Sequence, residues 1–230
     1  MRLRMRIRIP IALYTVILFI FLPVVSALGC NHQAEPAPTT VPPSPPSMAP
    51  SPEIPANYTT YTDDTNFFSI SYPSDWEPAL SLIADIEKEV KEVINDIKSG
   101  LPLEKVTVIF LAGQPMAGGI YNPNVNIAVE PILEGVSTLD QMVEAEIRGA
   151  KTIIQDYREY SRVKTTINGR EATILDYEGT LPGIAKRRML QMMTLVGETI
   201  WVVSCSSTYE DFATWEKDFH TIVRSLQISN

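Results

Sequence analysis

Few side chains of this sequence are of a type that could bind a metal ion or catalyse hydrolysis. His220 is the second of two histidines, and Glu216 precedes it by four residues. Residues four apart share a face of a helix, so both side chains could contact one divalent cation. Two ligands do not form a site, and a solvated Glu–His pair is the simpler interpretation. We therefore predict no metal site, and Glu216 and His220 are the candidates should one exist.

A hydrolase would also depend on His220, since the other histidine, His32, lies in a proline-rich stretch. The sequence contains no G-x-S-x-G, H-E-x-x-H, P-loop or G-x-G-x-x-G motif, which are short patterns of catalytic and nucleotide-binding sites. Glu144 and Glu146 are two residues apart, so they fall on different faces of a predicted helix. We predict a protein that is not an enzyme and that has no cofactor.

One short basic cluster stands out in an acidic chain. Four arginines precede Cys30 and no acidic residue does, so the other 15 Lys and Arg face 27 Asp and Glu, a net charge of −12. Such a chain repels phosphate backbones, which argues against nucleic acid as a partner. Lys186, Arg187 and Arg188, in "GIAKRRM", could bind an acidic partner or lipid headgroups. Protection of a strand edge against aggregation is the alternative interpretation.

Cys30 follows a segment that is typical of an export signal. "MRLRMRIR" is basic, "IPIALYTVILFIFLPVV" is apolar, and small residues lead to Gly29 and Cys30. The junction "SALGC" resembles a bacterial lipobox. This resemblance implies cleavage between Gly29 and Cys30, with a diacylglyceryl group and acyl chains such as palmitate on the cysteine. Two or more acyl chains anchor a protein stably in a membrane.

Two other interpretations of this segment stay open. Residues 9–28 could form an uncleaved transmembrane helix, since 20 residues are nearly enough to span a bilayer. The segment could also be an ordinary secretory signal with an incidental cysteine. The lipobox and the transmembrane helix both hold the protein at the cell membrane and place its domain outside the cytoplasm, in the periplasm or at the cell surface.

The stretch after Cys30 has the composition of a tether. Residues 31–57 hold nine of the chain's 18 prolines, which favour extended polyproline geometry over a packed core. At about 3.1 Å per residue such a segment reaches about 80 Å. We predict a lipoprotein signal peptide at 1–29, a lipidated cysteine and disordered tether at 30–57, and one folded domain at 58–230. Cys205, in the alternating "TIWVVSCSS", is then predicted to be a buried free thiol.

The folded domain combines hairpin strands with helices. Helical periodicity predicts helices over residues 80–98, 137–157 and 209–228. Asn168-Gly169 and Gly197-Glu198 are typical of tight hairpin turns between strands. Helices that occur before, within and after runs of hairpin strands favour an α+β fold, with an antiparallel sheet packed against helices.

The two ends of the domain resemble a known family. "FFSISYPSDW" (67–76) resembles the F-x-I-x-Y-P-x-x-W opening of PsbP-like domains, and a Gly-centred hairpin followed by "FATWEKDFHTIVRSLQI" resembles their ending. The resemblance implies an α/β/α sandwich with a central antiparallel sheet flanked by helices. A Ran-binding nuclear import factor shares this fold, and bacterial relatives are commonly lipoproteins. Phe68, Ile70, Tyr72 and Trp76 of the opening motif are expected in the core.

These features predict a lipid-anchored, extracytoplasmic PsbP-like protein that binds or helps to assemble a membrane-associated complex. Its expected partners are the membrane, through Cys30, and a protein complex within it. A carrier or sensor of a small ligand or cation is one alternative, and a hydrolase that uses His220 is another.

Overall fold

The computed structural model of the chain describes residues 53–84, 106–116, 120–180 and 185–229. The predicted signal peptide, Cys30 and nearly all of the predicted tether lie outside these residues. So does most of the helix expected over residues 80–98, of which the described part begins with a 3-10 turn, η1 (Leu80–Leu82). No helix within the described ranges is long and apolar enough to cross a membrane.

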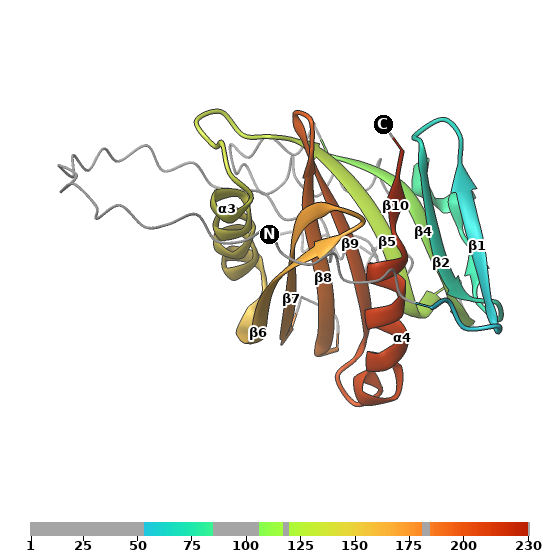
Figure 1. Ribbon diagram of the computed structural model, residues 1–230. Coiled ribbons are helices and arrows are strands. Elements are labelled where there is room, and N and C mark those ends of the chain that lie inside the picture. Colours follow the sequence, from blue (N-terminus) through green and yellow to red (C-terminus); the bar gives the residue numbers. More distant parts are fainter. Residues whose placement is uncertain (1–52, 85–105, 117–119, 181–184, 230) are drawn as a thin grey trace, which may run out of the picture.

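Within these ranges seven strands form an antiparallel sheet, in the order β3-β4-β5-β9-β8-β7-β6 (Figure 1). Their bounds are β3 (Glu77–Pro78), β4 (Thr107–Met116), β5 (Ile120–Pro131), β6 (Gln155–Ile167), β7 (Arg170–Thr180), β8 (Arg187–Val196) and β9 (Thr199–Thr208). A smaller antiparallel sheet has the order β1-β2-β10. It consists of β1 (Tyr58–Asp63), β2 (Phe68–Pro73) and β10 (Gln227–Ile228).

The hairpin turns lie where the sequence predicts them. Asn168 and Gly169 join β6 to β7 and both have positive φ, 50° and 78°, as the two central residues of a type I′ turn require. Gly197, with φ 59°, begins the turn between β8 and β9. These turns fix the antiparallel registers of β6 with β7 and of β8 with β9.

Helix α3 (Leu139–Ile153) is ended by the strand that follows it. Thr138 caps its first turn, because the threonine hydroxyl accepts a hydrogen bond from the Gln141 backbone N–H. The helix stops before Tyr157, where the sequence pattern placed its end, because the extended strand β6 begins at Gln155. The β propensity of this region, rich in aromatic and β-branched residues, therefore prevails over its helical periodicity.

The core on one face of the large sheet contains the opening motif. Helix α4 (Phe212–Ser225) packs against β2, β8 and β9 on this face. Phe68, Ile70, Tyr72 and Trp76 are all buried in this core, as the sequence predicts. Cys205 is buried there too and forms no disulfide with any described residue, so the predicted buried thiol is confirmed.

The opposite face carries α3, which packs against β6, β7 and β8. The two faces thus have different coverings (Figure 1), α3 on one and α4 together with the β1-β2-β10 sheet on the other. An α+β fold with an antiparallel sheet is confirmed. A sandwich flanked by helices alone is not confirmed, because a second sheet shares one face with α4.

Candidate functional site

The basic cluster at the start of β8 is divided between the two faces of the sheet. Successive residues of a strand point in opposite directions. Arg188 lies against the Phe212 ring on the α4 side. Arg187 points to the α3 side, where its Nη2 donates to Ser206 Oγ at 2.8 Å. The structure therefore does not bring Lys186, Arg187 and Arg188 together on one surface.

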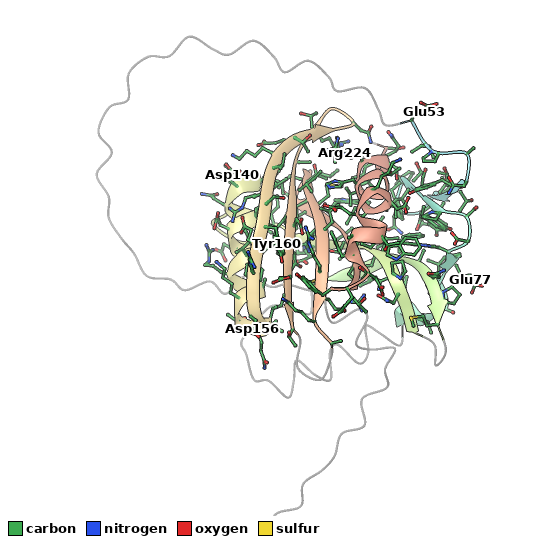
Figure 2. All side chains as sticks on the ribbon, turned by 90° about the horizontal axis from the view of Figure 1, so that it is seen from below. Glu53, Glu77, Asp140, Asp156, Tyr160 and Arg224 are labelled. Carbon is green, nitrogen blue, oxygen red and sulfur yellow. The ribbon has the colours of Figure 1, made fainter. Side chains whose placement is uncertain are left out.

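On the α4 side, two cations of the cluster lie against aromatic rings. The guanidinium carbon of Arg188 is 4.3 Å from the ring centroids of both Tyr160 and Phe212. The ammonium nitrogen of Lys186 is 4.4 Å from the Tyr209 ring centroid. Tyr160 and Tyr209 are 37% and 41% exposed, and Figure 2 shows Tyr160 between edge strand β6 and helix α4. We call Tyr160, Lys186, Arg188 and Tyr209 the aromatic–cation surface; the Phe212 ring beneath Arg188 is buried.

Two acidic residues of β7 hold these cations in place. Asp176 accepts two hydrogen bonds from Arg188, at 2.9 and 2.6 Å. Glu178 accepts one from Lys186 Nζ and one from the Tyr160 hydroxyl, both at 2.7 Å. Burial alone would raise the pKa of Glu178, but these two hydrogen bonds outweigh burial and lower it. The aromatic–cation surface is therefore pre-ordered by the carboxylates beneath it.

Glu216 and His220 lie on α4 beside this surface. Glu216 Oε1 lies 4.0 Å from Nη2 of Arg188. Within the described ranges Nδ1 of half-buried His220 has no hydrogen-bond partner. Burial lowers the pKa of His220, and the nearby Arg224 charge lowers it further. No group of three or more His, Cys, Asp and Glu side chains that could hold a metal ion occurs among the residues that the structure describes.

On the α3 side, polar side chains continue across three strands of the large sheet. We call this set of side chains the polar strip. Its members are Asn122, Asn124 and Asn126 of β5, Ser204 and Ser206 of β9, and Arg187 and Gln191 of β8. All except half-buried Asn122 are buried. Arg187 is the one charged member, and it contacts neutral oxygens, those of Ser206 and of Asn122 at 3.0 Å.

Further along the same face, two glutamates are buried between α3 and the sheet. Glu130 of β5 is 4% exposed and Glu146 of α3 is 2% exposed. Oε1 of each has no hydrogen-bond partner in the part of the chain that the structure describes. Burial raises the pKa of Glu130 to about 8. Burial, and then the proximity of Glu130, raise the pKa of Glu146 well above its ordinary range.

The polar strip and the glutamate pair were not found by sequence reasoning. The alternation of "NVNIAVEP" in β5 indicates one apolar and one polar face, and a polar face is usually solvent-exposed. The division of the basic cluster, by contrast, had a signal, because period-two alternation sets Arg187 opposite to its two neighbours. Treating "KRR" as one patch missed that signal.

Comparisons with known proteins place these sites on a known fold. The family model of PsbP matches residues 56–228. The structure of cyanobacterial PsbP (CyanoP) from Synechocystis is similar, with TM-score 0.50 and 14% identity over 81% of this chain and 100% of that chain. The structure of LpqN of Mycobacterium tuberculosis, which is involved in cell envelope biogenesis, is also similar. Its TM-score is 0.50, with 11% identity over 75% of this chain and 91% of that chain. In sequence, no curated protein matches this chain.

Proposed function

Because this chain belongs to the PsbP family, as its opening motif indicated, we propose that it is a non-enzymatic accessory protein of a membrane-associated protein complex. The lipid on Cys30 holds it at the cell membrane, with its domain outside the cytoplasm. Residues 31–57 extend from the anchor by up to about 80 Å, which lets the domain meet a partner above the membrane surface. The involvement of LpqN in cell envelope biogenesis supports this location by analogy of fold.

The observation that carries this proposal is the aromatic–cation surface. Tyrosine and arginine are enriched among the residues that dominate binding energy at protein interfaces. Here two exposed tyrosines lie beside cations that Asp176 and Glu178 already hold in place. A surface ordered before binding loses less side-chain entropy when a partner arrives. Lys186 and Arg188 contribute to this surface, whereas Arg187 lies on the other face of the sheet.

Photocrosslinking in the native membrane tests the proposal. A benzophenone amino acid replaces Tyr209 in the full-length protein, and a control protein carries it at exposed Lys151 on α3. We expect a discrete crosslinked membrane protein from position 209 and none from position 151. Cys30→Ala should abolish that product by releasing the domain from the membrane. Equal products at both positions would show that the surface is not the binding site. A product that survives Cys30→Ala would show that the anchor is not needed for binding.

A matched pair of truncations separates binding from folding. Tyr209→Ala removes an exposed ring of the surface, and Val163→Ala removes a side chain of β6 that is also exposed and lies outside it. We expect only Tyr209→Ala to lower recovery of the crosslinked protein from a second probe position at Tyr160. Both variants should keep the thermal midpoint of the unchanged protein, because neither side chain is in the core. Full recovery with Tyr209→Ala would show that Tyr209 does not contact the partner.

Carriage or sensing of a small ligand is a second candidate function. It is favoured by one specific observation, a buried arginine whose hydrogen bonds to other described residues go to neutral oxygens. That arginine lies on the opposite side of the sheet from the surface proposed for a protein partner, so the two functions do not compete for the same residues.

A further inference from the structure

The polar strip contains a buried positive charge that forms no ion pair with an acidic side chain of the described residues. The Arg187 side chain donates to Ser206 and Asn122, and its Nε has no hydrogen-bond acceptor within the described ranges. No ion pair involving Arg187 occurs in the part of the chain that the structure describes. Burial lowers the pKa of Arg187 to about 10, so the guanidinium stays protonated at neutral pH. A buried charge normally has a partner of opposite sign.

The buried glutamates are too far away to be that partner. Glu130 lies opposite Ile200 on β9, and Arg187 lies opposite Thr208 on the same strand. Eight residues of an extended strand correspond to about 27 Å. The positive charge of Arg187 and the acidic pair therefore occupy separate ends of one sheet face, and neither glutamate compensates that charge.

The side chains that continue the strip beyond Arg187 are amides and hydroxyls. Asn126 lies opposite Ser204 across β5 and β9, and both atoms of its side-chain amide lack a partner among the described residues. Gln191 Nε2 donates to Ser204 Oγ at 3.1 Å. An arginine fork at the end of a strip of neutral polar side chains suits a carboxylate or phosphate oxygen, which accepts several charge-assisted hydrogen bonds at once.

One end of the strip is the more open one. Arg187 is the first residue of β8 and keeps 8% of its surface exposed, whereas Ser204 and Asn126 have 0%. Asn122, which accepts from Arg187, is half-buried. A ligand would therefore meet the charged end first and place its remaining atoms deeper along the strip.

We propose that the polar strip is a binding site for a small oxyanion, whose carboxylate or phosphate group pairs with Arg187 while its other polar atoms meet Asn126 and Gln191. This site goes beyond the accessory role above and needs no protein partner. A purely structural alternative accounts poorly for it, because a buried cation that pairs with no acid among the described residues adds nothing to stability.

Thermal unfolding of the purified full-length protein tests the site with two probes, sodium phosphate and sodium acetate, at constant ionic strength. An anion that binds only the folded state raises the thermal midpoint by mass action. At about one hundred times its dissociation constant the rise for a chain of this size is about 5 to 10 °C. A rise with acetate alone indicates a carboxylate ligand, and a rise with phosphate indicates a phosphate ligand. Either result supports the proposal. If neither anion raises the thermal midpoint, the proposal is overturned.

Phosphate also stabilises folded proteins in general, because it is excluded from their surface. Variants of Arg187 distinguish binding at this site from that general salt effect. Arg187→Gln should lose the anion-dependent rise, and the control Arg162→Gln, at an ion pair on β6, should keep it. Arg187→Lys retains a charge without the planar fork, so it should show a smaller rise and serves if Arg187→Gln does not fold. Equal rises in the unchanged protein and in the Arg187 variants would overturn the proposal.

Discussion

The glutamate pair beneath α3 should make this protein less stable as the pH rises through the neutral range. In the unfolded chain each carboxyl has an ordinary pKa of 4.5, whereas burial raises the folded pKa of Glu130 to about 8 and that of Glu146 well above its ordinary range. Between these values the folded state binds more protons than the unfolded state. The stabilising contribution is therefore complete below about pH 4.5 and is lost as the pH rises through the folded pKa.

The magnitude follows from linkage. One carboxyl that is protonated in the folded state and ionised in the unfolded state lowers the unfolding free energy by about 1.4 kcal/mol per pH unit. From about pH 5 to about pH 7 a single carboxyl thus removes about 3 kcal/mol. Glu146→Gln replaces the acid with a neutral group of similar shape. Between about pH 5 and about pH 7, the unfolding free energy of this variant should therefore rise by about 3 kcal/mol relative to that of the unchanged protein.

Urea unfolding followed by tryptophan fluorescence at several pH values measures this difference. The control is Glu144→Gln, two residues away on α3, where the side chain is 52% exposed and pairs with Arg162. That variant should keep the pH slope of the unchanged protein. The decisive quantity is the slope, because a buried glutamine amide can also change stability at every pH. If Glu146→Gln keeps the full slope, then Glu146 is ionised in the folded protein and the reasoning from burial is refuted.

Two further predictions concern close packing on each side of the sheet. A Cβ on Gly179 would lie 1.9 Å from Ile154 Cγ2 and 3.1 Å from the Gln155 carbonyl oxygen, so Gly179→Ala should lower the unfolding free energy by about 1–3 kcal/mol through overpacking. Urea unfolding checks this, and an unchanged midpoint would contradict the close approach. In a Cys30→Ala variant, Cys205 is the one thiol left; burial raises its pKa, so a disulfide reagent should label it only after unfolding. Rapid labelling of the native protein would show that the thiol is accessible.

Local sequence patterns were sufficient for the elements that depend on a few adjacent residues. Asn168-Gly169 predicts its hairpin because both residues tolerate positive φ. Thr138 predicts the start of α3 because its hydroxyl can accept from the first turn. The alternation of Phe68, Ile70 and Tyr72 predicts one buried strand face, and all three are in the core. In each case the required information lies within a few residues of the chain.

The candidate sites depended on contacts between distant segments. Glu144 and Glu146 are separated by a single residue, yet Glu144 is exposed and Glu146 is buried. The difference arises from which face of α3 meets the sheet. The period of a helix defines its faces, but the packing partner decides which of them loses contact with water.

The polar strip shows the same division of information. By itself the sequence determined that Asn124 and Asn126 share one face of a strand, and that Arg187 points away from Arg188. Alternation of side chains is a property of any extended backbone. Only the tertiary structure decided that this polar face is buried and that β5, β9 and β8 set its amides and hydroxyls beside Arg187. Burial and strand order are set by packing across the whole domain, so no short stretch of sequence contains them.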